Sequence, residues 1–358
     1  MATSLLERMM KTGSVSGSAL LSQSTIFAKK DPIRTDLPVL NIAFSGELDG
    51  GLVSGLTILA GVSKTFKSAL GVYCMKAYLD KYPDAIAIFY DTEFGINESY
   101  IRAFGIDPNR VVHIPVDHIE MLKFDMTKKL EAINKGDRVF FFVDSIGQIS
   151  SKKEVDDAID EKSVADMSRA KALRSLLRLV TIQLAKKDLP CIMVNHVYQT
   201  MELYSKTVIP GGTAVTYSAN QIFVISKSQE KNNDGDLDGW KFTITVEKSR
   251  FVKEKSKLAF QVMYDKGIQK YSGLLDIALE LGYVIKPSNG WYSRVLSGGE
   301  VEDKKWRIKD TDSTEFWTPL LSLVEFKDAV TKRYKLTHDV VSADTSDEHI
   351  DALDELED

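Results

Sequence analysis

The sequence has 358 residues, 44% hydrophobic and 27% charged, which is the composition of a globular protein able to bury a substantial core. It contains no run of about 18 or more apolar residues, so a membrane-spanning helix is not expected. The first residues, MATSLLERMMKTGS, lack the apolar core and cleavage site of a secretory signal and favour a short amphipathic helix. Cys74 and Cys191 lie in apolar stretches, so we expect buried free thiols and a reducing, cytoplasmic setting.

The net charge of −5 is unevenly distributed. Residues 342–358 contain eight acidic side chains and no lysine or arginine, so the rest of the chain carries +3 once these eight charges are set aside. Such a segment has few apolar residues to bury, so a mobile tail is expected. The rest of the chain is mildly basic, so nucleic acid is a reasonable partner for it. The negative net charge of the whole chain would have suggested otherwise.

Short apolar stretches begin after a Gly/Ser-rich patch and a polar linker. They predict strands at 56–60, 85–90, 138–144, 190–195, 220–226, 242–247 and 258–264. The first four are almost continuously apolar, as strands buried on both faces of a parallel sheet are. Helices are expected between them, at 67–82, 119–135 and 164–187. This alternation predicts an α/β fold with a mostly parallel sheet and helices on both faces.

The last three strands follow one another through polar turns, so we expect them to be antiparallel at one edge of the sheet. Beyond Gly273, the stretch LLDIALELGYVIKPSNGWYS is typical of a helix followed by a hairpin. We therefore divide the chain into an N-terminal helix and linker, a core domain, a small C-terminal α/β domain and an acidic tail. Their expected bounds are 1–35, 36–270, 271–341 and 342–358.

The stretch GVSKTFKS nearly matches the phosphate-binding loop G-x-x-x-x-G-K-[ST], but Phe66 stands where the pattern has glycine. The stretch follows an apolar strand and opens a helix, which is the setting such a loop requires. Lys67 would reach the β- and γ-phosphates, and the Ser68 hydroxyl would ligate Mg²⁺. The expected nucleotide-binding residues of the loop are Gly61, Val62, Ser63, Lys64, Thr65, Phe66, Lys67, Ser68 and Ala69. An ordinary strand-to-helix turn with exposed polar residues is the alternative.

Two carboxylates follow neighbouring apolar strands. Asp144 ends the stretch RVFFFVD, where an acid in such sites helps to hold Mg²⁺, although an aspartate there is also a common helix cap. Glu93, in FYDTEFG, lies just past the preceding strand and could orient and deprotonate an attacking water. A solvated loop acid is the alternative for Glu93.

Six stretches occur in the order found in one family. They are GGLVSGLTILAGVSKTFKS, IFYDTEFGINESYIRAFGID, VFFFVDSIGQISSKKE, PCIMVNH, IPGGTAVTYSAN and VEKSR. Together they resemble the RecA-type recombinases, and most of all the UvsX type of tailed-phage recombinase, over about residues 40–285. That branch also has phenylalanine before the lysine of its phosphate loop. Because a phenylalanine carries a Cβ, we expect its ring to point away from the phosphates and to pack beside the loop.

The resemblance implies further nucleotide-site residues. Glu93 matches the family's catalytic glutamate and Tyr100 the aromatic residue that stacks on adenine. Lys248 and Arg250, two residues apart on an expected strand, match a pair of cations that one subunit places on the γ-phosphate of its neighbour. Without the resemblance they would be an exposed strand end. His196 matches a polar residue that senses the γ-phosphate, although the family more often has glutamine there.

The resemblance also implies two DNA loops. The first lies near residues 150–163, and Arg169, at the start of the next helix, aligns with a DNA contact of the family. The second lies at 197–215 and includes Gly211 and Gly212. It is long for a connection within a compact domain, and such loops are usually functional or disordered.

The function implied is that of an ATP-dependent recombinase that forms filaments on single-stranded DNA and exchanges strands with a homologous duplex. ATP and Mg²⁺ are the expected cofactors. DNA, further copies of the chain, a single-strand-binding protein and a loading mediator are the expected partners, in the cytoplasm of a phage host. Phe27 would anchor a neighbouring subunit or pack on its own domain. A ring-forming helicase of the same superfamily and a non-catalytic recombination mediator are the alternatives.

Overall fold

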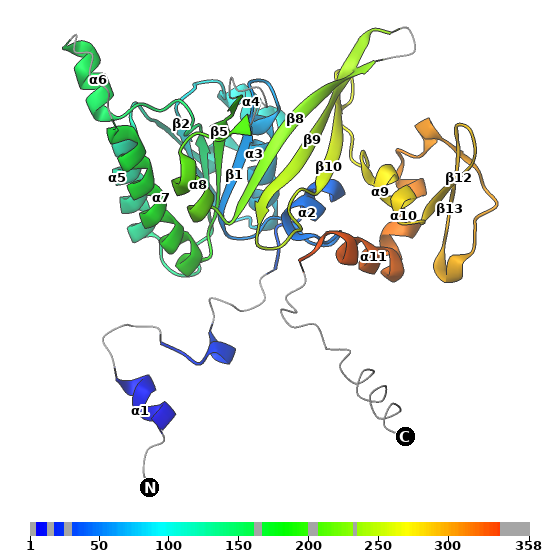
Figure 1. The fold of residues 1–358 in the computed structure, drawn as a ribbon, viewed down its shortest axis with the longest axis horizontal. Helices are drawn as coiled ribbons and strands as arrows, with labels where there is room; N and C mark the ends of the chain where they lie inside the picture. Colours follow the sequence, from blue (N-terminus) through cyan, green and yellow to red (C-terminus); the bar gives the residue numbers. More distant parts are fainter. Residues whose placement is uncertain are drawn as a thin grey trace, which may run out of the picture.

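The computed structural model describes residues 5–12, 18–24, 31–160, 167–199, 207–231 and 235–336 (Figure 1). Phe27 and residues 342–358, on which two expectations depend, lie outside these ranges. The described part holds no helix long and apolar enough to cross a membrane. Cys74 and Cys191 are buried and free, as expected.

A nine-stranded sheet forms the centre of the molecule, in the order β11-β10-β9-β8-β1-β5-β4-β2-β3. Its strands are β1 (Gly55–Gly61), β2 (Ile86–Asp91), β3 (Val111–Pro115), β4 (Val139–Asp144), β5 (Pro190–His196), β8 (Gln221–Lys231), β9 (Leu237–Ser249), β10 (Lys257–Met263) and β11 (Gly267–Ile268). A two-stranded ribbon, β6 (Tyr198–Gln199) with β7 (Thr207–Val208), lies apart from this sheet. The expected α/β core, with its mostly parallel sheet and antiparallel edge, is confirmed.

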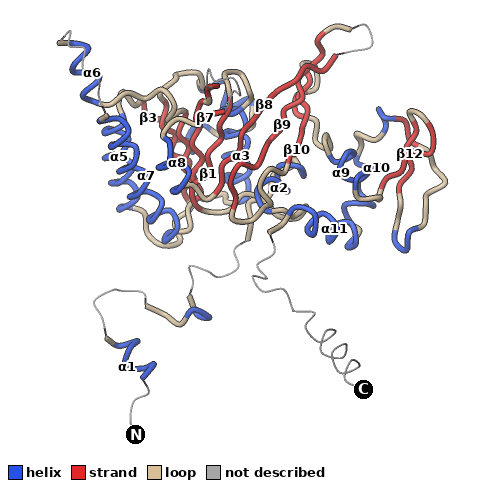
Figure 2. Tube along the Cα trace, viewed as in Figure 1, coloured by secondary structure: helices blue, strands red, loops and turns tan. Residues whose placement is uncertain are grey.

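The pairing changes from parallel to antiparallel between β8 and β9. β8 is parallel to β1, and only the pairs β8–β9, β9–β10 and β10–β11 are antiparallel. The expected antiparallel edge is therefore present: β8 with β9 and β9 with β10 pair in antiparallel fashion, and β8 joins them to the parallel strands through β1. The chain reaches β8 through a helix, which allows a parallel strand, whereas β9 follows directly through a hairpin. The β8–β9 hairpin extends beyond the rest of the sheet (Figure 2).

Helices cover both faces of the sheet and divide the core into two apolar clusters. One face packs against α2 (Pro38–Ser45), α3 (Lys67–Lys81) and α4 (Glu98–Ala103), and the other against α5 (Ile119–Ala132), α7 (Ser168–Lys187) and α8 (Gly212–Ser218). Two further helices, α1 (Leu5–Lys11) and α6 (Lys152–Ile159), bury no residue. α6 projects from one end of the molecule (Figure 1).

Several short elements were not expected from the sequence. α2 has proline at its start and buries all eight residues, so it shows no polar face from which to recognise a helix. β3 is a five-residue edge strand with no fully buried residue. α6 lies within the expected first DNA loop, and a reciprocal pair of hydrogen bonds between Ser151 and Glu154 starts it. Short 3-10 turns occur at Leu21–Gln23, Pro108–Arg110, Ser297–Gly299 and Ile308–Asp310.

The C-terminal part contains a small antiparallel sheet and three helices. Its elements are α9 (Leu274–Glu280), β12 (Val284–Ser288), β13 (Trp291–Arg294), β14 (Trp306–Arg307), α10 (Thr314–Ser322) and α11 (Val324–Tyr334). The helix and hairpin expected after Gly273 are α9 and β12–β13. The end of α11 returns to the core, where Lys335 pairs with Val252 in an antiparallel bridge. The residue bounds of the four expected parts remain a prediction.

The strand register fixes where polar residues meet. Gly61 at the end of β1 lies opposite His196 at the end of β5, and Asp91 at the end of β2 lies opposite Asp144 at the end of β4. All four strands run in the same direction, so their carboxyl ends share one edge of the sheet. Ligands of open α/β sheets bind at this edge.

Candidate active site

A cleft of about 310 Å³ opens at the carboxyl edge of the sheet. It is lined by the loop before α3 and the start of that helix, by Glu93 after β2, by Tyr100 of α4, by the end of β5 and by Phe242 in the middle of β9. The lining residues are Ser63, Lys64, Thr65, Phe66, Lys67, Ser68, Ala69, Glu93, Tyr100, Val194, His196 and Phe242. The fold thus brings most of the predicted nucleotide-site residues together.

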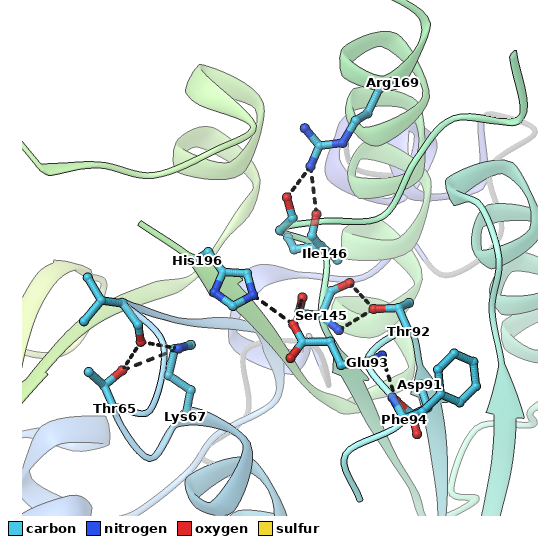
Figure 3. A network of polar contacts seen from close by, with 12 residues as sticks. Thr65, Lys67, Asp91, Thr92, Glu93, Phe94, Ser145, Ile146, Arg169 and His196 are labelled. Atoms are coloured by element: carbon cyan, nitrogen blue, oxygen red, sulfur yellow. Dashed lines mark hydrogen bonds and ion pairs between the residues drawn. The ribbon is translucent and has the colours of Figure 1, made fainter. Parts of the chain in front are cut away.

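The loop between β1 and α3 wraps around the side chain of Lys67. Its Nζ donates to the Val62 carbonyl oxygen at 2.7 Å and contacts the Thr65 hydroxyl at 3.4 Å (Figure 3). Lys67 is buried, and burial lowers its pKa although Glu93 and Asp144 oppose this effect. Burial deprives the ammonium group of the water that would stabilise its charge, and an anionic phosphate bound beside it would provide that stabilisation.

Phe66 occupies the glycine position of the loop with a left-handed backbone, φ 67° and ψ 13°. Its ring lies against Phe242 of β9, with ring centroids 5.0 Å apart, and against Phe260 of β10 at 5.8 Å. This packing offsets the cost of a positive φ in a residue with a Cβ. The ring therefore packs beside the loop, as expected, and the antiparallel edge of the sheet provides its contacts.

Ser68 and Asp144 meet beneath the loop. Asp144 is buried, and its Oδ1 has no hydrogen-bond partner among the described residues. Burial raises the pKa of Asp144 to about 6; the charges of Glu93 and Asp91 act in the same direction, while a hydrogen bond with Ser68 opposes them. An unsatisfied carboxylate oxygen beside a serine hydroxyl fits a magnesium ion, which prefers oxygen ligands and usually takes few from the protein.

Glu93, which lines the cleft, is held by Ser145, directly after β4, and by His196, the last residue of β5. Its Oε1 accepts from Ser145 Oγ at 2.6 Å and lies 2.8 Å from His196 Nε2 (Figure 3). Burial favours a higher pKa for Glu93, but the hydrogen bonds with Ser145 and His196 outweigh it and hold the pKa below its usual range. The carboxylate is therefore ionised at neutral pH and able to accept a proton.

Asp91 is a positioning residue that the sequence analysis missed. Its buried Oδ1 accepts from the backbone N–H groups of Glu93, at 3.1 Å, and Phe94, at 2.7 Å. Thr92 braces the same turn, because its hydroxyl donates to the carbonyl oxygen of Ser145 and accepts from the N–H of Ser145. An aspartate two residues before Glu93 is the usual signal for such a turn and could have identified it.

The two predicted trans cations do not line this cleft. Lys248 lies near the end of β9, and Arg250, which is exposed, follows one residue beyond the strand. The Lys248 ammonium group donates to the carbonyl oxygens of Thr216 and Ala219 at the end of α8. The fold therefore separates these two residues from the nucleotide-site residues of the same chain.

Comparisons with known proteins identify the group to which this site belongs. Residues 39–269 match the family described as the RecA N-terminal domain, and residues 271–330 match the C-terminal domain of the phage T4 recombination and repair protein. The recombination and repair protein of Enterobacteria phage T4 is 48% identical over 96% of this chain and 90% of its own length. The chain belongs to the RecA family of recombinases.

More distant RecA proteins match a shorter part of the chain. Protein RecA of Aquifex pyrophilus is 23% identical over 74% of this chain and 76% of its own length. Protein RecA of Aquifex aeolicus is 24% identical over 72% of this chain and 74% of its own length. The resemblance to the phage recombinases that was inferred from the sequence motifs is thereby confirmed.

The second DNA loop expected of a RecA-family chain begins directly after His196, which lines the cleft, and the first follows β4. Arg169 of α7 donates to the carbonyl oxygens of Ile149 at 2.7 Å, Gly147 at 2.6 Å and Ile146 at 3.3 Å, so its guanidinium group faces the start of the first loop (Figure 3). Gly211 and Gly212 both have positive φ at the start of α8. Residues 161–163 of the first loop and 200–206 of the second lie outside the described residues.

Proposed function

We propose that this RecA-family chain is a DNA-dependent ATPase that forms filaments on single-stranded DNA and exchanges strands with a homologous duplex. The observation that supports this most strongly is the position of Glu93, which lines a phosphate-loop cleft and is held there by Ser145 and His196. The coincidence of a buried Lys67, an unsatisfied Asp144 and an oriented glutamate argues against a non-catalytic mediator.

ATP is the proposed substrate, and the loop residues bind it. Residues 61–69 surround the phosphates, Lys67 neutralises charge on the β- and γ-phosphates, and Tyr100 stacks on the adenine. Ser68 and Asp144 would hold Mg²⁺, which would neutralise charge on the phosphates and orient them for attack. The unpartnered Oδ1 of Asp144 supports this assignment.

Glu93 is the proposed general base. Ionised at neutral pH, it orients a water molecule toward the γ-phosphate and accepts its proton. Ser145 and His196 both bind Oε1, which fixes the plane of the carboxylate. His196 also lies next to Asn195, whose Nδ2 donates to the Pro210 carbonyl oxygen at 2.9 Å. Through this contact, a change at the γ-phosphate that His196 senses would reach the second DNA loop.

Lys248 and Arg250 are proposed to act on the nucleotide of the adjacent subunit. Their distance from the cleft of their own chain supports a role in trans, in which they stabilise charge on the transferring phosphoryl group. In this proposal ATP hydrolysis depends on assembly, so the filament is the form that hydrolyses ATP. The DNA loops, with Arg169, Gly211 and Gly212, bind the DNA backbone without sequence preference, while base pairing tests homology.

The remaining expectations stay predictions. A single-strand-binding protein and a loading mediator are proposed partners, and the host cytoplasm is the proposed place of action. Arg169 has two proposed roles, as a DNA contact and as the residue that holds the carbonyl oxygens of Ile146, Gly147 and Ile149 in place. The three hydrogen bonds of its guanidinium group favour the second role in the absence of DNA.

Electron microscopy of the full chain with single-stranded DNA and ATP tests the proposed function. We expect helical filaments for the wild type and for Glu93→Gln, with hydrolysis in Glu93→Gln reduced by about 10²- to 10⁴-fold because the general base is lost. Lys67→Ala is the matched control, since it removes nucleotide binding and therefore ATP-dependent filaments. Closed rings would favour the helicase, and the absence of any assembly would favour the mediator. Near wild-type hydrolysis in Glu93→Gln would show that another residue is the base.

A further inference from the structure

Lys248 contacts a helix end in its own chain. Its Nζ donates to the carbonyl oxygens of Thr216 and Ala219, the latter at 2.7 Å. These carbonyls belong to the last turn of α8, of which Ala219 is the C-cap. The final carbonyl groups of a helix lack partners within the helix, and a cation there satisfies them and is favoured by the helix dipole. Lys248 therefore caps α8.

An irregularity in β9 directs Lys248 to that helix. Ile222 of β8 pairs with Lys248, but the next residue, Phe223, pairs with Val246, so Glu247 is extra on β9. Phe223 and Val246 belong to the apolar cluster on one face of the sheet, and Ile222 belongs to the cluster on the other. A bulge reverses the alternation of side chains beyond it. It thereby moves Lys248 to the face that α8 covers.

The two ends of α8 have different neighbours. Its first residue, Gly212, directly follows Gly211, and both glycines belong to the proposed second DNA loop. Its last turn lies on Lys248. The cap uses two of the three N–H donors of an ammonium group, which leaves one donor for a further acceptor. Arg250, the other proposed trans cation, makes no hydrogen bond or ion pair with the described part of the chain.

We propose that Lys248 is a positioning residue for the DNA loop as well as a trans cation. It holds the C-terminal end of α8 with two donors and offers the third to a phosphate of the neighbouring subunit's nucleotide. DNA that stabilises α8 thereby also holds Lys248 in position to bind that phosphate. By thermodynamic linkage, the bound nucleotide then raises the affinity for DNA by the same factor by which DNA raises the affinity for the nucleotide. This inference rests on the proposed function for both the DNA loop and the trans contact.

Hydrogen exchange of the full chain without nucleotide or DNA tests the cap by itself. In Lys248→Met we expect the amides of residues 212–220 to exchange about 2- to 30-fold faster, since a cation at a helix end stabilises it to that extent. Arg250→Met removes the other proposed trans cation, and Lys255→Met removes a 66%-exposed cation that pairs with Glu247 of the bulge. Neither should alter exchange in this segment. Unchanged exchange in Lys248→Met, or equal acceleration in all three, would overturn the proposal.

Lys248→Arg is a control for the case in which the Lys248→Met protein is poorly folded. The guanidinium group keeps the charge and the donors, so exchange of residues 212–220 should stay within about 2-fold of the wild type. Acceleration in Lys248→Arg equal to that in Lys248→Met would count against the cap.

The coupling to DNA is tested with a labelled oligothymidylate and no nucleotide. Lys248→Met should bind it about 2- to 30-fold more weakly than Arg250→Met, because only Lys248 holds α8. Equal affinities would overturn the coupling. DNA-stimulated ATP hydrolysis reports separately on the proposed function, which requires loss of activity in both variants. Full activity in Arg250→Met would refute the trans assignment and leave the cap of α8 intact.

Discussion

Asp144 is an acid whose environment resists ionisation. It is buried at the end of β4, close to Glu93 and Asp91, and its pKa is raised to about 6. An unfolded aspartate titrates near 4, so the folded chain binds a proton more tightly than the unfolded chain in the interval between these values. The stability that this group contributes is fully present below about pH 4 and is lost as the pH rises through about 6.

Asp144→Asn should therefore stabilise the protein in the absence of nucleotide and metal. A shift of about two pKa units corresponds to roughly 2–3 kcal/mol at pH 7.5, and the advantage should vanish near pH 4. Urea unfolding at a series of pH values measures this difference. The gain should shrink or reverse with added Mg²⁺ if the metal stabilises the wild type through Asp144.

Glu302→Gln provides a control of opposite sign. A hydrogen bond from Arg294 lowers the pKa of Glu302, so the stability of this pair is present at neutral pH and is lost as the pH falls through the lowered value. Glu302→Gln should be less stable than the wild type at neutral pH, and this difference in the free energy of unfolding should become smaller at acidic pH. If Asp144→Asn were less stable than the wild type at pH 7.5, the raised pKa would be wrong.

At the scale of elements, the end of α11 packs tightly on the end of α2. Gly46 closes α2 with φ +77°, and a Cβ there would lie 2.7 Å from the Lys335 Cα. Lys335 also pairs with Glu47, and Lys327 of α11 pairs with Asp49 at 2.6 Å. The glycine thus allows the C-terminal part of the chain to approach the core closely.

A pair of glycine substitutions measures this approach. Gly46→Ala should lower the free energy of unfolding by about 2–4 kcal/mol, of which about 1–2 kcal/mol is the cost of a positive φ in alanine. Gly105→Ala is the matched control: its φ is +76°, but the nearest atom to its Cβ would be Lys76 Cε at 3.8 Å. Chemical denaturation gives both values. An equal loss of unfolding free energy in the two variants would show that α11 moves to accommodate the added methyl group with no further loss of stability.

At the scale of the whole molecule, the last described residue, Leu336, lies beside the proposed trans cations. The amide N–H of Leu336 donates to the Phe251 carbonyl oxygen at 2.8 Å, one residue beyond Arg250. Residues 342–358, which lie outside the described residues, add eight carboxylates to a body of charge +3. A tethered polyanion competes with DNA phosphates for the same cations, and salt screens this competition beyond roughly 10 Å at about 0.1 M.

Deletion of residues 342–358 should increase the affinity for duplex DNA at low salt and lower the Mg²⁺ required for strand exchange, with ATP affinity unchanged. A variant with the eight acids replaced by asparagine and glutamine separates charge from length. The duplex affinities of the deletion variant and of the neutralised variant should approach that of the wild type as the salt concentration increases. Equal duplex affinities at low salt would contradict autoinhibition and would favour a docking site for a partner protein.

The sequence by itself determined the order of the core elements and the place of the candidate site. Buried parallel strands are almost continuously apolar, and a phosphate loop must join a strand to a helix, so both are visible in neighbouring residues. Parallel strands end at one edge of the sheet, so acids that follow apolar strands meet there. Lys67, Ser68, Glu93 and Asp144 were located in this way. Short elements such as α2 and β3 were missed because they lack a periodic pattern.

Only the tertiary structure decided which partners these side chains have. Phe66 is accommodated by Phe242 and Phe260, which come from strands far along the chain. Lys248 caps α8 because a bulge in β9 turns its side chain to the other face of the sheet. Arg169 donates to the carbonyl oxygens of Ile146, Gly147 and Ile149. Side-chain periodicity predicts a face, but a hydrogen-bond partner depends on how separate elements pack and on single-residue register shifts. Those are properties of the folded chain, because distant segments become neighbours only when they pack together.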